Sequence, residues 1–267
     1  MNTEDVVRAH YRRDDLEGVA LAALRRVGVD VDALRVEDLA GLDQLHAGAA
    51  IATEHVLDAL DLSAEMSVLD VGAGVGGPAR LAAARHGCRV TGVDLSPDFV
   101  AVARSLTDRV GLSALVSFEI GSALALPAGD AAFDRAMLSH VGMNIADKGA
   151  VFAEVRRVLV DGGRFAVYEQ MRTGDGDLTY PLPWAHDEQS SFVEWREEYA
   201  RLLVSAGFVV ERDESLAPFL AASGPPRQEG LTPADLFGAG FDERIGNNLA
   251  ATFAGILSPV LIVARAV

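Results

Sequence analysis

The sequence predicts an α/β protein with a doubly wound, mostly parallel sheet. Between residues 67 and 170, five short β-branched segments alternate with helical stretches, as in right-handed βαβ units around a parallel sheet. A glycine-rich turn directly after the first of these segments is the second observation. Two more strand-like segments, at 208–215 and 260–267, follow without a normal crossover helix. We therefore expect a seven-stranded sheet with an antiparallel last strand.

The boundaries of these elements follow from local signals. The five strands are expected at residues 67–71, 89–94, 115–120, 133–138 and 164–170. The helices between them are expected at residues 78–87, 96–111 and 146–163. Ser96 suits the N-cap of the second helix, and Pro97 suits its first helical position. Gly87 and the pair Gly162–Gly163 are expected to end the first and third helices.

The chain divides into a leading helical part and a core. Residues 1–62 carry helical periodicity, and we expect them to form an N-terminal helical lid. The core is expected to span residues 63–267, with helical cap insertions around 173–206 and 216–256. Within the first insertion, a turn-rich segment is followed by a helix expected at 192–207.

Composition excludes several classes of protein. A length of 267 residues suits one large domain or one domain with a cap. The net charge of −16 argues against nucleic-acid binding, because the summed field would repel a polyanion. No segment is long and apolar enough to span a bilayer, and the N-terminus lacks the order of a signal peptide. The single cysteine, Cys88, fits a cytoplasmic protein without internal disulfides. A monomer and a homodimer both remain open.

The turn after the first strand has the form G-x-G-x-x-G, from Gly72 through Gly74 to Gly77. Such glycines allow backbone N–H groups to approach a ligand at a helix N-terminus. Asp94 lies at the end of the second strand, where a carboxylate hydrogen-bonds the two hydroxyls of a ribose. The motif by itself is typical of a dinucleotide site.

Asp70 gives the same stretch a second form, D-x-G-x-G-x-G, ending at Gly76. A carboxylate two residues before the first glycine would repel a pyrophosphate. It would attract the ammonium and sulfonium groups of S-adenosylmethionine (SAM). Asp70 therefore favours SAM, although a carboxylate that only caps loop amides is a second interpretation.

At this point residues 67–170 resemble a class I SAM-dependent methyltransferase. "VLDVGAGVGG" resembles the first motif of that family and "VTGVDLSP" its ribose-binding motif. "GSALALPAGDAAFD" and "EVRRVLVDGGRFAVYE" resemble the adenine segment and the helix and strand that follow. With "LDQLHAGAAIAT" and "HVGMNIADK", the whole chain resembles the small-molecule branch related to sarcosine/dimethylglycine and quinone-precursor methyltransferases. The resemblance implies a Rossmann-like methyltransferase fold, SAM as cofactor and methyl transfer to a small molecule.

The resemblance also implies a set of cofactor-binding residues. They are Asp70, Gly72, Gly74, Gly76, Asp94, Leu95, Ser122, Ala123, His140 and Gln44. Ser122 departs from the family pattern, in which an aspartate commonly holds the adenine amino group. A serine hydroxyl accepts that hydrogen bond more weakly than a carboxylate. The backbone of Ala123 would then carry more of the adenine recognition.

Two residues are candidates for a catalytic base. His140 directly follows the fourth strand, and its ordinary pKa suits proton transfer near neutrality. Its alternative role is to position a loop or to contact the cofactor through its main chain. Glu169, at the end of the fifth strand, is the second candidate, with a solvated or helix-capping carboxylate as the alternative. A base is needed only if the acceptor carries a proton at reaction.

Three residues are candidates for the acceptor pocket. Tyr180 and Trp184, in "YPLPWA", are expected at its wall, where aromatic rings would stack on a planar acceptor or face a cationic amine. The alternative is that Trp184 only anchors a proline-rich loop. His46 precedes the helix that leads into the first strand and is expected near the cofactor, although a structural role suits a lone histidine equally. The histidines form no metal-ligand spacing, so no metal is expected.

These observations predict transfer of a methyl group from SAM to an O, N or C atom of a small molecule. The first alternative keeps the fold and cofactor but performs non-methylating chemistry, such as cyclisation or decarboxylation. The second is a nonenzymatic SAM-binding protein. The third is a nicotinamide-dependent oxidoreductase, which the glycine turn fits but which Asp70 and the later motifs oppose.

Overall fold

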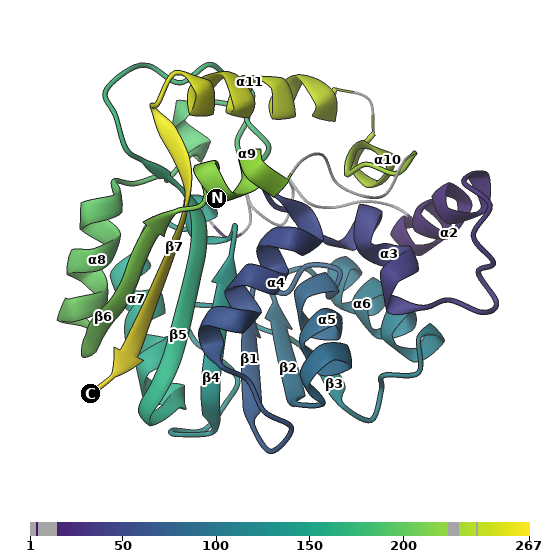
Figure 1. Ribbon diagram of the computed structural model, residues 1–267, viewed down its shortest axis with the longest axis horizontal. Helices are drawn as coiled ribbons and strands as arrows, with labels where there is room; N and C mark the ends of the chain where they lie inside the picture. Colours follow the sequence, from purple (N-terminus) through teal and green to yellow (C-terminus); the bar gives the residue numbers. More distant parts are fainter. Residues whose placement is uncertain (1–3, 5–14, 224–229, 239) are drawn as a thin grey trace.

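The computed structural model describes Glu4 and residues 15–223, 230–238 and 240–267. A seven-stranded sheet in the order β3-β2-β1-β4-β5-β7-β6 crosses the molecule, with helices on both faces (Figure 1). The strands are β1 (Ser67–Val71), β2 (Arg89–Asp94), β3 (Val116–Ile120), β4 (Phe133–Ser139), β5 (Leu159–Arg172), β6 (Phe208–Ser215) and β7 (Leu257–Ala266). β7 is antiparallel to both of its neighbours, and the other pairings are parallel. The expected fold class is confirmed.

Helices precede, connect and follow the strands. Those before the sheet are α2 (Leu16–Arg26), α3 (Val36–Asp43) and α4 (Ala49–Leu60). Those between the first five strands are α5 (Gly77–His86), α6 (Pro97–Arg109), the 3-10 turn η1 (Gly142–Asn144) and α7 (Lys148–Val158). Those after β5 are η2 (Glu188–Ser190), α8 (Arg196–Ser205), α9 (Ala217–Ser223), α10 (Ala234–Phe237) and α11 (Phe241–Phe253). Ser96 caps α6 as expected, since its side chain accepts from the backbone N–H of Phe99.

Alternating side chains of the strands enter two separate cores. In β1, Val68 packs with α4, α5 and α6 on one face of the sheet, whereas Leu69 packs with α7 and α8 on the other. Both side chains are fully buried. The inner strand β7 is buried at nearly every residue, whereas the edge strand β3 begins with alternating buried and exposed residues.

The largest differences from the expected helix boundaries occur at two places. The third connecting helix ends at Val158, and residues 159–163 belong to β5, because Leu159 already pairs with Phe133 of β4. The late helix begins only at Arg196. Residues 192–195 are extended, because the N–H of Phe192 donates to the carbonyl of Met143. In both places a long-range backbone hydrogen bond overrides the local helical pattern.

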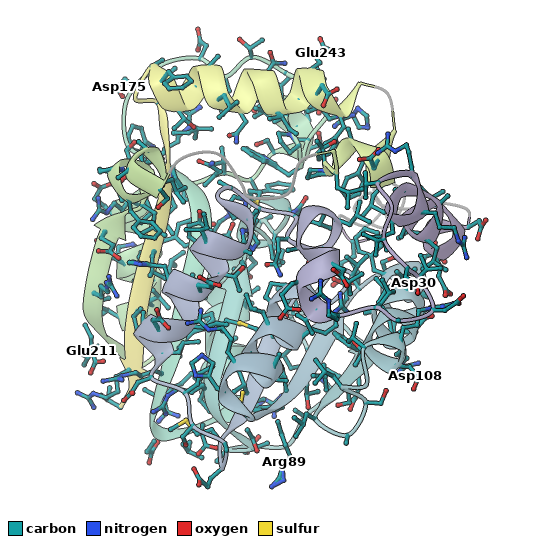
Figure 2. The ribbon with its side chains drawn as sticks, turned by 45° about the vertical axis from the view of Figure 1, so that its right-hand side comes forward. Asp30, Arg89, Asp108, Asp175, Glu211 and Glu243 are labelled. Carbon is teal, nitrogen blue, oxygen red and sulfur yellow. The ribbon has the colours of Figure 1, made fainter. Side chains whose placement is uncertain are left out.

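The charged side chains lie around the outside of the molecule. Asp30, Asp108, Asp175 and Glu243 are exposed and lie near its periphery, on or beside helices and loops of different parts of the chain (Figure 2). These four acidic residues therefore do not form one patch.

A buried ion pair connects α3, one of the N-terminal helices, to α5, which follows the glycine turn. Arg80 of α5 is fully buried, and its Nη2 donates to Oδ2 of Asp43 in α3 at 2.9 Å. The same guanidinium donates to the carbonyls of Val75 and Ala103 and to the hydroxyl of Thr107. One side chain therefore joins α3, the glycine turn and α6.

We expect the Asp43→Ala substitution to lower the free energy of unfolding by about 3–5 kcal/mol, because it leaves the buried charge of Arg80 without its partner. Urea unfolding followed by circular dichroism measures this change. Glu198→Ala is the control, because Glu198 pairs with the exposed Arg201 and should shift the midpoint little. Equal effects of the two substitutions would show that the ion pair does not hold α3 in place.

Candidate functional site

A cavity of about 350 Å³ opens at the carboxyl ends of the parallel strands. The glycine turn after β1, the end of β2 and the loops after β3 and β4 line one part of it. The segment between α3 and α4, the 183–184 segment, Phe237 and Phe241 line the rest. Ligands of open α/β sheets bind at this edge.

The glycine turn is pressed closely against its neighbours. Gly72 has φ +73°, and a Cβ atom there would lie 2.3 Å from a methyl carbon of Val141. Gly76 has φ +87°, and its Cβ would lie 2.5 Å from the ring of Phe118. Both positions require glycine for conformation and for space. The turn thus brings bare backbone to the cavity, although Gly76 itself does not line it.

Asp94 holds the glycine turn from the neighbouring strand. Its Oδ2 accepts from the N–H of Gly74 and its Oδ1 accepts from the N–H of Ser96, both at 2.8 Å. Burial raises the pKa of its carboxyl group, and these backbone bonds oppose that rise. Asp94 and Gly74 both line the cavity. Each carboxylate oxygen keeps a lone pair, so Asp94 fits the two hydroxyls of a ribose.

Asp70 lies beneath the turn and does not line the cavity. Burial, and then the charge of Asp94, raise its pKa to about 7. Its Oδ2 is buried without a hydrogen-bond partner. A buried carboxylate with one oxygen unpartnered, close to the glycine turn, fits a ligand that carries positive charge. The proposed contact of Asp70 with SAM stays a prediction.

The segment expected to contact adenine lies opposite the end of β2. Leu95, Ser122 and Ala123 all line the cavity. The hydroxyl of Ser122 donates to Oε1 of Glu4, which lines the same part of the cavity. The carboxylate of Glu4 thus lies beside Ser122, at the position where the family pattern commonly has an aspartate.

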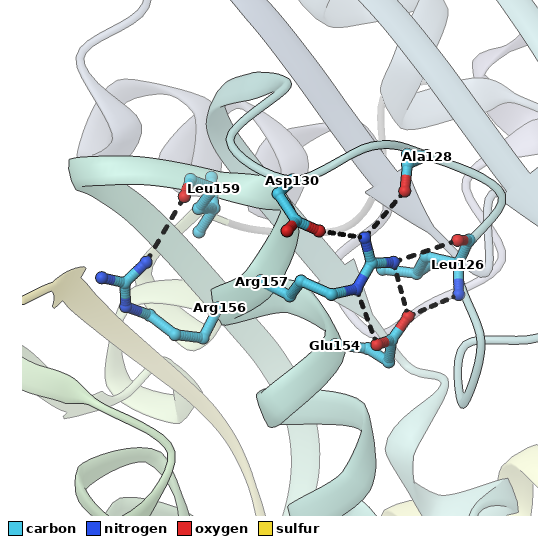
Figure 3. Close-up of polar contacts among 7 residues, drawn as sticks. All are labelled: Leu126, Ala128, Asp130, Glu154, Arg156, Arg157 and Leu159. Atoms are coloured by element: carbon cyan, nitrogen blue, oxygen red, sulfur yellow. Dashed lines mark hydrogen bonds and ion pairs between the residues drawn. The ribbon is translucent and has the colours of Figure 1, made fainter.

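Arg157 of α7 fixes the loop that follows this segment (Figure 3). Its guanidinium donates to the carbonyls of Leu126 and Ala128 and to the carboxylate of Asp130. Glu154 completes the arrangement, because it pairs with Arg157 and accepts from the N–H of Leu126. The loop therefore has a fixed course before any ligand binds.

His140 combines an uncommon backbone with an unpartnered nitrogen. Its φ is +56°, and its N–H donates to the carbonyl of Tyr168 at 2.8 Å. Its Nε2 is buried without a hydrogen-bond partner, and the residue lines the cavity. Burial, and then the neighbouring His46, lower the pKa of His140 well below its ordinary value. Left-handed backbone at a non-glycine residue is concentrated at functional sites. A neutral imidazole of this kind can accept a proton from a bound hydroxyl.

Glu169 lies behind the His140 loop and does not line the cavity. Its Oε1 accepts from the N–H groups of Val141 and Gly142, both at 2.8 Å. Burial raises its pKa to about 8, although these two bonds and Lys148 oppose the rise. In this position the carboxyl group anchors the loop. Its proposed role as a base remains a prediction that this contact pattern does not favour.

His46 and Gln44 share one buried hydroxyl. Thr53 Oγ1 lies 2.6 Å from Oε1 of Gln44 and 2.9 Å from Nε2 of His46. His46 lines the cavity, and its ring centroid lies 5.7 Å from that of His140. Gln44 is buried and does not line the cavity. Gln44 therefore helps to hold the Thr53 hydroxyl that contacts His46, and His46 itself forms part of the cavity wall.

Of the two aromatic candidates for the acceptor pocket, only Trp184 lines the cavity. Trp184 lines the cavity, and its Nε1 donates to the hydroxyl of Ser191 at 3.0 Å. Tyr180 does not line the cavity and packs in a satellite core with Trp184 and Leu182. The ring of Trp184 is both an anchor and part of the wall.

Several residues that line the cavity were not predicted from the sequence as site residues. Phe237 and Phe241 lie within the expected second insertion, and their rings stack at 4.7 Å. Their spacing in "LFGAGF" is a weak signal, because any buried helix shows it. Met143 and Glu4 gave no local signal, since only the fold brings them to the cavity.

The described residues show neither a metal site nor a membrane-spanning helix. Within the described ranges, no group of three or more His, Cys, Asp or Glu side chains is arranged to hold a metal ion. No described helix has the length and apolar character needed to cross a membrane.

Sequence comparison identifies the central part of the chain. Residues 69–167 match the family of the methyltransferase domain. Methyltransferase GfsG of Streptomyces halstedii is 36% identical over 140 residues, which cover 52% of this chain and 50% of the relative. Methyltransferase phqN of Penicillium fellutanum is 32% identical over 161 residues, covering 60% and 48%. The chain thus spans about half the length, or less, of the curated relatives it matches.

Structural comparison extends the similarity to the whole fold. Geranyl diphosphate C-methyltransferase of Streptomyces coelicolor A3(2), solved with Mg²⁺, geranyl diphosphate and S-adenosylhomocysteine (SAH), aligns over 99% of this chain and 97% of its own, with 20% identity and a TM-score of 0.70. The [4+2]-cyclase SpnF aligns over 100% and 97%, with 24% identity and a TM-score of 0.68.

The strand order reverses direction between β1 and β4, and the cavity lies at this switch point, where open α/β sheets bind their ligands. Residues 69–167 match the methyltransferase domain family, and solved methyltransferases share the fold of the whole chain. The methyltransferase resemblance expected from the sequence agrees with these findings for this part of the chain.

The state of His46 gives a test of the pocket without any ligand. Burial lowers its pKa from 6.5 to about 4. Between these values the unfolded chain binds more protons than the folded chain, so the free energy of unfolding should fall as pH is lowered through this range. Urea unfolding at pH 7, 6 and 5 should show a shallower dependence for His46→Gln than for the natural protein. Identical slopes would contradict the assignment.

Proposed function

We propose that the protein transfers the methyl group of SAM to a small-molecule acceptor. One observation carries the proposal. A single cavity joins the glycine turn and Asp94, which fit a nucleoside cofactor, to the buried, unpartnered Nε2 of His140. Residues that fit a nucleoside cofactor and a candidate base therefore line one cavity, which supports the proposal.

SAM supplies an electrophilic methyl group on a sulfonium, and the protein would hold the acceptor atom next to that methyl group. Holding the acceptor against that methyl in attack geometry is a proximity effect that reaches about 7–11 kcal/mol in model reactions. His140 would accept the proton that the acceptor loses. Trp184, Phe237 and Phe241 would exclude water from the reacting atoms.

The proposal extends to the rest of the molecule. Helices in residues 1–62 would act as a lid, since α2 and α3 pack with Leu231 and Leu236 of the late insertion beside the cavity. Residues 1–3, 5–14, 224–229 and 239 of the expected lid and cap lie outside the described residues. The acidic surface and the single cysteine support a cytoplasmic monomer or homodimer without a nucleic-acid partner.

The main alternative is non-methylating chemistry in the same pocket. A neighbour named as a cyclase has this fold, so the fold by itself does not decide the reaction. Transfer of isotope from methyl-labelled SAM to an acceptor separates the two possibilities, because a cyclase leaves the methyl group on sulfur.

Cofactor binding is the first test of the proposal. Asp94→Ala should weaken the binding of SAM and SAH by roughly 100-fold, because it removes two hydrogen bonds to a charged group. Isothermal titration calorimetry measures both ligands, with reduced nicotinamide cofactor as a third titrant. Asp108→Ala, which removes an exposed carboxylate, is the charge-matched control. Absence of binding by SAM and SAH to the natural protein would overturn the proposal.

The base is tested with His140→Asn, since asparagine tolerates the left-handed backbone of this position. We expect the rate of methyl transfer to an acceptor found with labelled SAM to fall roughly 100-fold or more. SAH affinity should change only slightly. His186→Asn, at an exposed histidine, is the control. An unchanged rate in His140→Asn would remove His140 from the chemistry.

A further inference from the structure

A large part of the cavity wall is apolar. Side chains from four separate parts of the chain form it: Leu45, Met143, Pro183, Trp184, Phe237 and Phe241. The side chains of Met143 and Trp184 are almost fully buried. The indole N–H of Trp184 already donates to Ser191 and is not available to a ligand. This wall therefore offers contact area and few hydrogen-bond donors.

The described lining contains no arginine and no lysine. Its two histidines, His46 and His140, are neutral, because burial lowers the pKa of both. An acceptor with a phosphate, diphosphate or carboxylate would therefore meet no positive charge among these residues. Placing an unpaired anion there would be costly. The negative field of the whole protein adds to that cost.

The acidic residues of the lining do not form a site for an amine. Asp43 is paired with Arg80, and Oδ1 of Asp147 caps α7 at the N–H of Ala150. Asp94 and Glu4 belong to the nucleoside end of the cavity. All four acidic side chains of the described lining thus already accept hydrogen bonds from groups of the protein.

Three polar side chains of the described lining cluster at and after the end of β4, namely Ser139, His140 and Asn144, and the buried Nε2 of His140 has no hydrogen-bond partner. We propose that the acceptor is a neutral, largely apolar molecule that presents a single hydroxyl group to His140, an inference that rests on the proposed methyl transfer. The hydroxyl oxygen forms a bond to the methyl carbon while the carbon–sulfur bond breaks and its electron pair remains on sulfur. The hydroxyl proton passes to Nε2, which must therefore be the unprotonated nitrogen of His140. The products are a methyl ether and SAH.

Three probes with the same ten-carbon chain separate the possible charges of the acceptor. Geraniol is neutral, geranylamine is cationic and geranyl diphosphate is anionic. Each is titrated by calorimetry into protein saturated with SAH, in buffer that contains Mg²⁺. We expect geraniol to bind at least roughly tenfold more tightly than either charged probe. Tighter binding of a charged probe, or no binding of all three, would overturn the proposal.

Two variants place the geraniol site at the apolar wall. Phe241→Ala should weaken geraniol binding roughly tenfold, because it removes a lining ring. Phe253→Ala is the matched control, since this ring lies on the same helix and is 88% exposed. Equal effects of the two variants would place geraniol elsewhere on the protein. SAH affinity is measured in the same series. If SAH does not bind, the proposed function itself is contradicted. If SAH binds and geraniol does not, only the proposed acceptor chemistry is contradicted.

Discussion

The buried guanidinium of Arg80 is the contact on which the geometry of the site depends. It bonds the carbonyl of Val75 in the glycine turn, the carboxylate of Asp43 in α3 and two acceptors in α6. A charge at this depth is costly unless all its partners stay in place. The turn, the leading helices and the helix beside the nucleoside end are therefore coupled. Displacement of any one of them removes some of the acceptors that surround this buried charge.

Three buried carboxyl groups surround the same edge of the sheet. Burial raises the pKa values of Asp70, Asp94 and Glu169, so each is less stable as an anion here than in water. The protein tolerates them because backbone amides of the turn and of the His140 loop donate to Asp94 and Glu169. A cationic cofactor placed near Asp70 would stabilise its ionised form. Local instability and ligand recognition thus have the same electrostatic origin.

The sequence predicted the features that depend on neighbouring residues. Strand alternation, the cap at Ser96 and the glycines at 72, 74 and 76 all carry short-range signals, and the structure contains them. It did not predict that β5 begins at Leu159, because this depends on pairing with β4. Nor did it bring Glu4 to Ser122 or Phe241 to the cavity. The position of Glu169 was expected, but its contact with two loop amides follows only from the folded backbone.

The place of β7 has a consequence for how the molecule is made. This strand comes late in the chain, yet it lies between β5 and β6 and is almost wholly buried. During synthesis on the ribosome, β5 and β6 have no mutual hydrogen bonds and cannot close the sheet until β7 has emerged. Until then the parallel strands β1 to β5 leave the backbone edge of β5 unpaired, and an unpaired strand edge is prone to wrong pairing. Completion of the sheet is therefore a late and long-range step.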